Sequence, residues 1–252
     1  MGSAICTVFF HNYYGDHERW VRLISEKMTV PFILFYNIVE DSLYNSGDDY
    51  KWINDIGKTT SGPFLQKIFV RRSPNQGKDI GGKLVLIDAS MHGMDTTRYC
   101  IFLHDKNSPH KTQHREWREK LFHIIEPSFA DRAIAAFDRD PKIGIIARSN
   151  SIINEYDFGR QAFASNNRSI LTQLKSTYAI STDDHRYVAG TMFWARTLPL
   201  LNFFSQHPPL DVRNQLEKGN VMDDYKGTNT HSWERLLSWI FFAQGYTIKE
   251  LE

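Results

Sequence analysis

Residues 66–91 read QKIFVRRSPNQGKDIGGKLVLIDASM, and this stretch decides the fold class. Gln66–Arg71 is a short, apolar-rich run that is typical of a strand. Gly81–Met91 repeats its apolar residues at helical spacing, which predicts an amphipathic helix. A glycine-bearing turn joins the two. This order of strand, turn and helix is the repeating unit of α/β proteins with a parallel sheet.

The same alternation extends in both directions along the chain. We predict strands at Ala4–Phe10, Phe32–Val39, Gln66–Arg71, Arg98–Leu103, Ile143–Ala147 and Tyr187–Ala195. We predict helices at Asp16–Met28, Gly81–Met91, Trp117–Ile125, Asp131–Phe137, Leu198–Phe204 and Ser232–Ala243, with a short helix around Tyr50–Ile56. The segment 152–182 is predicted to be irregular and partly helical, and 208–230 to be a loop. The pattern therefore predicts an α/β fold with a mostly parallel sheet flanked by helices.

Length and charge limit the classes of protein to consider. A chain of 252 residues suits one sizeable domain, so we assign residues 1–252 to a single domain and leave open its excision from a longer protein. The 30 Lys and Arg residues balance 29 Asp and Glu residues, which argues against a nucleic-acid partner.

Apolar runs such as Ile5–Phe10 are strand-sized, far short of the ~20 residues of a membrane span, so no transmembrane segment is predicted. Cys6 and Cys100 lie in predicted strands and are interpreted as small buried residues. Without a secretory signal at the start, the expected compartment is the cytoplasm, with peripheral membrane association left open.

The turn Asn75–Gly82 has two interpretations. Its glycines and the start of the following helix could bind an anion through free backbone N–H groups, or they could serve only as a turn and helix cap. It is not a P-loop: Gly77 and Gly82 have the right spacing and Lys83 follows, but Leu84 stands where a hydroxyl must bind magnesium.

Polar residues also follow the predicted strand Arg98–Leu103. The carboxylate of Asp105 could hold a divalent ion that bridges two phosphates, and Lys106 could neutralise a diphosphate directly. His104 and His110 could touch phosphate or bind nothing. We do not assign a zinc site to these histidines, because the pair at helical spacing lacks the adjacent Glu of zinc proteases.

Two further places carry candidate residues. Glu234 falls at the start of the last predicted helix, three residues after His231. An acidic residue there can be catalytic, or it can simply be stabilised by the positive end of the helix dipole. Gly190 interrupts a strand, which often marks the close approach of a ligand or of another backbone. Trp194 on the same predicted strand offers a flat face for a sugar or base.

The order of these motifs resembles the RgpF-like rhamnan synthesis family of GT-A glycosyltransferases. The resemblance runs from about His11 to Tyr246, nearly the whole chain. It is carried by Asn75-x-Gly77-x-Asp79-Ile80-Gly81, Leu103-His104-x-Lys106-x-Ser108, Asp140-Pro141-Lys142-Ile143-Gly144, Ala189-Gly190-Thr191-Met192-Phe193-Trp194 and Glu234-Arg235-Leu236. It implies a GT-A fold and the transfer of a sugar from a nucleoside-diphosphate donor to a glycan acceptor, with rhamnose as the suggested sugar.

The resemblance also implies roles for individual residues. Asn75 and Asp79 would face the nucleotide, His11 its base or ribose, and Glu234 would remove the acceptor proton in an inverting transfer. The Asp-x-Asp metal motif of GT-A enzymes is replaced by His104-Asp105-Lys106, so manganese or magnesium dependence is left open, with Asp105 as the predicted ligand. The predicted sets are Glu234 and His231 as catalytic residues, His11, Asn12, Asn75, Lys78, Asp79 and Lys106 for the nucleotide, and His104, His110, Gly190 and Trp194 for the substrate.

Two alternatives compete with a transferase. One is a non-catalytic domain that binds a nucleotide sugar or a glycan with the same fold. The other is a hydrolase or nucleotidyltransferase on the same scaffold, since fold does not fix function. Against the latter, the chain has neither a Gly-x-Ser-x-Gly elbow nor paired carboxylates after the strand Arg98–Leu103.

Overall fold

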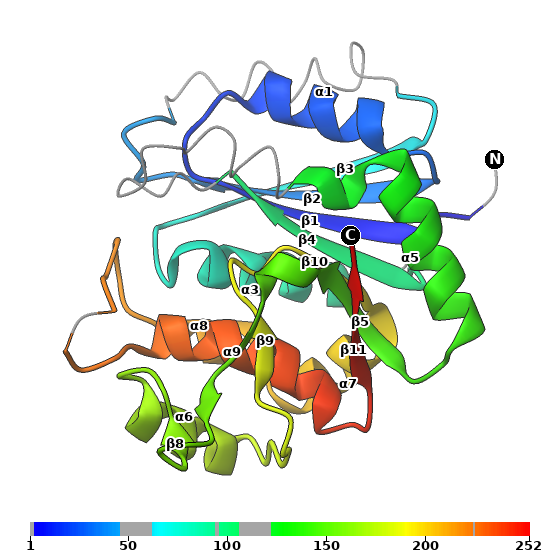
Figure 1. Ribbon diagram of the computed structural model, residues 1–252. Coiled ribbons are helices and arrows are strands. Elements are labelled where there is room, and N and C mark those ends of the chain that lie inside the picture. The colour runs from blue at the N-terminus through cyan, green and yellow to red at the C-terminus, as the bar shows by residue number, and fades with distance from the viewer. Residues whose placement is uncertain (1–2, 46–61, 94–95, 106–121, 224) are drawn as a thin grey trace.

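The computed structural model describes residues 3–45, 62–93, 96–105, 122–223 and 225–252 (Figure 1). Within these ranges, seven strands form one sheet in the order β11-β5-β10-β4-β1-β2-β3. Its strands are β1 (Cys6–Asn12), β2 (Phe32–Val39), β3 (Leu65–Ser73), β4 (Tyr99–His104), β5 (Ile143–Arg148), β10 (Phe193–Arg196) and β11 (Thr247–Leu251). All neighbours pair in parallel except β10, which is antiparallel to both β4 and β5. The predicted α/β fold with a mostly parallel sheet is confirmed.

The helices follow the strands along the chain. They are α1 (His17–Lys27), α3 (Lys78–Met91), α5 (Pro127–Arg139), α6 (Arg168–Thr177), α7 (Thr197–Gln206), α8 (Pro209–Asn214) and α9 (Asn229–Phe242), with short 3-10 helices η1 (His123–Ile125) and η2 (Ser149–Ser151). Two small antiparallel pairs lie outside the main sheet: β6 (Ile152–Asn154) with β9 (Arg186–Val188), and β7 (Tyr156–Asp157) with β8 (Ala162–Phe163).

Helices cover both faces of the sheet (Figure 1). Because side chains alternate along a strand, Val8 and Phe10 enter one hydrophobic core and Phe9 enters the other. The first core is closed by α1 and α5, and the second by α3, α6, α7, α8 and α9. No helix in the described part of the chain combines the length and the apolar character that crossing a membrane requires.

The prediction of one strand over Tyr187–Ala195 is wrong. The chain forms β9, turns, and re-enters the main sheet as β10. In the turn the amide of Thr191 donates to the carbonyl of Val188 at 3.1 Å, and Gly190 has a φ of 77°. A left-handed residue at this point stops the extended backbone, and glycine adopts that conformation without steric cost.

Other boundaries also differ from the sequence prediction. The segment 208–230 contains α8 rather than only a loop, because Pro209 begins the helix, where proline is favoured. Strand β11 was not predicted, and it pairs with β5. The predicted helix around Tyr50–Ile56 lies outside the described residues, as do the first residues of the one predicted over Trp117–Ile125, whose described end is η1.

Candidate functional site

The turn between β9 and β10 lies where the carboxyl end of β4 meets the amino end of β10. This follows from the antiparallel register, in which Phe193 of β10 is opposite Phe102 of β4. The carboxyl edge of the parallel strands is the usual place for ligands in open α/β sheets. Gly190 and Thr191 are therefore at the edge where the predicted site residues are expected.

A buried cluster of Asp79, Lys83 and Thr191 holds this turn against α3. Lys83, fully buried on α3, donates to the carboxylate of Asp79 at 3.0 Å and to the carbonyl of Thr191 at 2.9 Å, and it also contacts the Thr191 hydroxyl. That hydroxyl donates to Asp79 Oδ2 at 2.8 Å. Thr191 has a φ of 50°, which is strained for a β-branched residue. The three contacts to Lys83 and Asp79 hold Thr191 in this conformation.

The peptide groups of Gly190 connect two predicted site residues. His104, buried at the end of β4, donates its Nε2–H to the Gly190 carbonyl at 2.8 Å and lies 3.9 Å from Asp79. On its other side, the Gly190 amide donates to Glu234 Oε1 at 2.7 Å. The structure thus brings Asp79, His104 and Glu234 around one turn, although they come from α3, β4 and α9.

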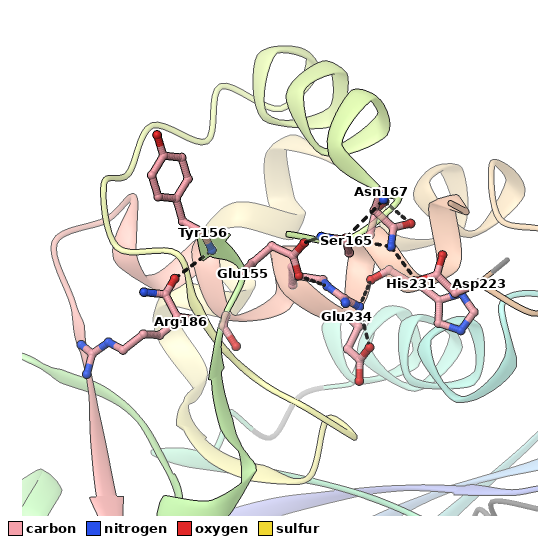
Figure 2. Close-up of polar contacts among 12 residues, drawn as sticks. Glu155, Tyr156, Ser165, Asn167, Arg186, Asp223, His231 and Glu234 are labelled. Carbon is pink, nitrogen blue, oxygen red and sulfur yellow. Dashed lines mark hydrogen bonds and ion pairs between the residues drawn. The ribbon is translucent and has the colours of Figure 1, made fainter. Parts of the chain in front are cut away.

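Glu234 is also part of a buried charge network (Figure 2). Arg235 donates to Glu234 at 2.8 Å and to Glu155 at 2.9 Å, and its guanidinium lies 4.5 Å from the centre of the Tyr187 ring. Burial raises the pKa of Tyr187 to about 12, although nearby Arg235 lowers it. Among the neighbours named here, Arg235 is the cation that compensates both carboxylates.

Helix α9 begins earlier than predicted, which changes how Glu234 and His231 are interpreted. Thr228 is the N-cap, and its hydroxyl accepts the His231 amide at 3.0 Å. The Nδ1 atom of His231, a residue labelled in Figure 2, is 2.6 Å from the same Thr228 hydroxyl. Because α9 starts at Asn229, Glu234 falls in its second turn and does not act as a first-turn acidic cap.

A second polar row crosses the ends of β1, β2 and β3. Ser73 donates to Asn37 Oδ1 at 3.0 Å, and Asn37 Nδ2 donates to His11 Nδ1 at 3.1 Å. His11 packs directly on Gly82 of α3: a Cβ on that glycine would lie 1.8 Å from His11 Nδ1. Helix α3 can approach His11 this closely because residue 82 has no side chain.

Asp105 binds backbone rather than standing free. Its two carboxylate oxygens accept the amides of Tyr13 and Tyr14 at 2.9 and 2.7 Å, and it is fully buried. Among the residues that the structure describes, no group of three or more His, Cys, Asp or Glu side chains could hold a metal ion. Both carboxylate oxygens of Asp105 are thus engaged by backbone amides, and a metal ion at Asp105 stays a prediction.

Three further predicted nucleotide residues, Asn75, Asn12 and Lys78, lie at or beside the ends of β3, β1 and α3. Asn75 donates to Asn220 at 3.0 Å, and Asn220 donates to the Tyr13 hydroxyl at 2.9 Å. Asn12 closes the loop after β1 by exchanging hydrogen bonds with the backbone of Gly15 at 2.7 and 3.1 Å. Lys78 is the first residue of α3, with a φ of 51°.

Among the described residues, Trp194 is not part of this arrangement. Trp194 lies in the core on β10, where its indole N–H donates to the Ile124 carbonyl at 2.7 Å. Lys106 and His110 lie outside the described residues. Conversely, no role was predicted for Lys83 and Thr191. The spacing of Asp79 and Lys83, which suits an ion pair on one helix face, was the available signal for Lys83.

We expect Gly81→Ala to destabilise the protein by about 1–3 kcal/mol, the usual cost of overpacking. A Cβ at this position would lie 1.7 Å from the backbone carbonyl oxygen of Gln76, so the turn that carries Asn75 would have to move. Denaturant unfolding measures the loss. The matched control is Gly93→Ala, whose Cβ would be no closer than 3.4 Å to its neighbours. Equal unfolding midpoints for the two variants would contradict the steric argument.

Two known sequences or families are similar to this chain. The chain is 26% identical over 181 residues to the uncharacterized protein WxcX of Xanthomonas campestris pv. campestris (strain B100). That match covers 71% of this chain and 24% of the relative, so it spans about a quarter of that protein's length. Residues 3–246 match the family model described as rhamnan synthesis protein F. The chain therefore belongs to the rhamnan synthesis protein F family.

Proposed function

We propose that this protein is a glycosyltransferase of GT-A type that moves a sugar from a nucleoside-diphosphate donor to a hydroxyl group of a growing polysaccharide. The observation that carries the proposal is the meeting of Asp79, His104 and Glu234 around the Gly190–Thr191 turn. Membership of a rhamnan synthesis family supports polysaccharide synthesis as the process and rhamnose as the first sugar to test.

In the proposed reaction the acceptor hydroxyl oxygen bonds to the anomeric carbon while the bond from that carbon to the diphosphate breaks. Glu234 takes the proton of the acceptor hydroxyl as general base. The diphosphate leaves with the bonding electron pair, so positive groups near it stabilise the transition state. Lys106 keeps its predicted role as such a cation, and metal dependence stays a prediction. Attack from the face opposite the leaving group inverts the anomeric centre.

The loops after β1 and β3 are the proposed nucleotide side of the site. His11 is held by Asn37, and Asn75 by Asn220, so both polar side chains have fixed orientations before a ligand arrives. Fixed polar groups reduce the entropy that is lost when a ligand binds. We assign the nucleotide to His11, Asn75 and Asp79, and the acceptor to the side of Glu234.

The test measures nucleoside diphosphate released from UDP-, dTDP- and GDP-sugars, with dTDP-rhamnose among them. We expect the protein to release nucleoside diphosphate from the sugars of one nucleotide. The same free nucleotide should raise the melting temperature of the protein, since a ligand that binds the native state stabilises that state. Each assay is run with EDTA and with manganese to decide metal dependence. The proposal would be refuted if no nucleotide raised the melting temperature and no donor released nucleoside diphosphate.

A second candidate, a binding domain without catalysis, is favoured by one observation. Both oxygens of Glu234 already accept hydrogen bonds, from Gly190 and Arg235. A carboxylate held in this way can serve structure alone. The same experiment separates the two functions: the binding domain would be stabilised by a nucleotide and would release none from any nucleotide sugar.

A further inference from the structure

The segment 216–220 runs between the glycine-bearing turn before α3 and the start of α9. Its backbone is bonded to the turn, because the Gly77 amide donates to the Glu217 carbonyl and the Gly219 amide to the Asn75 carbonyl, both at 2.7 Å. Gln76 and Lys218 form an antiparallel bridge between these bonds. Segment 216–220 is therefore bonded to the turn through its main chain.

The side chain of Glu217 makes the second connection. Its carboxylate accepts the amides of Asn229 and Thr230 at 2.7 and 2.9 Å, and the Thr230 hydroxyl at 2.7 Å. Amides in the first turn of a helix have no partner within the helix. Burial raises the pKa of Glu217, but these hydrogen bonds outweigh burial and the pKa lies below its ordinary value. The ionised carboxylate also complements the positive end of the α9 dipole.

Packing reinforces the connection. Leu216 is buried against Gly77, where a Cβ on the glycine would lie 2.3 Å from the Leu216 side chain. Gln76 also donates to the Leu216 carbonyl at 3.1 Å. Residue 217 thus has its backbone bonded to the turn that leads to Asp79 and its side chain bonded to the helix that carries Glu234.

We propose that Glu217 is a positioning residue that sets where Glu234 stands relative to Asp79 and His104 by tying the first turn of α9 to the turn before α3. The role in catalysis rests on the proposed function. The tie between the two elements does not, because it is a property of the folded chain. A carboxylate that only caps α9 would leave the turn at residues 75–77 unaffected when it is removed.

The first experiment needs no substrate. Amide hydrogen exchange is compared between the unaltered chain, Glu217→Ala and Glu217→Gln, the second being kept in case the first does not fold. We expect faster exchange both at residues 229–231 and at residues 75–77 in Glu217→Ala, and a smaller change at both places in Glu217→Gln. Faster exchange at residues 229–231 alone would overturn the proposal, since it would show a cap without a tie.

The matched control is Asp138→Asn, which removes a carboxylate beside Tyr99, at the amino end of β4. The Tyr99 hydroxyl donates to Asp138 at 2.7 Å, and this bond, with Arg98, holds the pKa of Asp138 below its ordinary value. We expect exchange at residues 75–77 and 229–231 to be unchanged in this variant. A rise at those residues in the control equal to that in Glu217→Ala would reduce the effect to general destabilisation and overturn the proposal.

The second experiment uses the donor that the unaltered chain turns over. We expect kcat to fall about 10- to 100-fold in Glu217→Ala, because a small misplacement of a reacting group has effects of this size. KM for the donor should stay within about threefold, since the nucleotide contacts are not removed. An unchanged kcat would overturn the positioning role. If the unaltered chain turns over no donor, the proposed function fails, and the exchange experiment still decides whether the tie exists.

Discussion

Glu234→Gln should lower turnover by about 100- to 10,000-fold, the range expected when a general base is removed. Glutamine has nearly the same shape and can still accept the Gly190 amide, which donates to Glu234 at 2.7 Å. It cannot take the acceptor proton, so the loss should appear in kcat while the nucleotide still raises the melting temperature. Steady-state kinetics measure the effect, with the nucleotide sugar that the unaltered chain turns over as the donor.

The control for Glu234→Gln is Glu155→Gln. Both carboxylates accept hydrogen bonds from Arg235, and Glu155 is the more buried of the two. A structural role for the network predicts similar losses of turnover in the two variants. A catalytic role for Glu234 predicts that Glu155→Gln keeps most of the turnover, within about tenfold. Full activity in Glu234→Gln would refute the assignment of the base.

Lys83→Met should destabilise the protein by about 3–5 kcal/mol, because removing one partner of a buried ion pair leaves the other charge uncompensated. Asp79 would lose a contact of 3.0 Å, and the Thr191 carbonyl would lose one of 2.9 Å. A second change, Asp79→Asn, should recover part of the loss because it neutralises the stranded carboxylate. Urea unfolding of both variants measures these free energies.

A second ion pair provides the comparison for Lys83→Met. Lys27 contacts Glu126 at 3.1 Å, and the two side chains are 33% and 37% exposed, so solvent screens the pair. Lys27→Met should change the free energy of unfolding by less than about 1 kcal/mol. Equal losses of unfolding free energy in Lys83→Met and Lys27→Met would show that burial does not strengthen the contribution of Lys83 to stability.

The sequence predicted the fold best where strands are buried on both faces. The predicted strand Phe32–Val39 has the observed bounds, because its residues are all buried and an apolar run interrupted only by Asn37 is, at this length, typical of a buried strand. Strand β11 was missed, since only Ile248 of its five residues is buried and the others carry no pattern. The short helix α8 was hidden by Pro209, which reads as a breaker unless it stands at the first helical position.

The candidate site was partly predictable for a similar reason. Loops after parallel strands converge at one edge, so the closeness of Asp79 and His104 followed from topology. The roles of Lys83 and Thr191 did not. A lysine is rarely buried, and a threonine within an apolar run reads as strand, whereas here tertiary contacts force a left-handed backbone. Such local conflicts between preference and conformation are expected at functional sites.

The spacing between His104 and Glu234 depends on the backbone of Gly190, which His104 and Glu234 contact from either side. Side chains can swing to admit a bulkier molecule, but the N–H and C=O of Gly190 belong to two adjacent planar peptide groups joined at one Cα, and the turn holds that joint at a φ of 77°. If the proposed transferase is evolved toward larger sugars, single exchanges at positions 104 or 234 should therefore gain little. Changing the length of the loop that contains residues 189–191 is the more productive route.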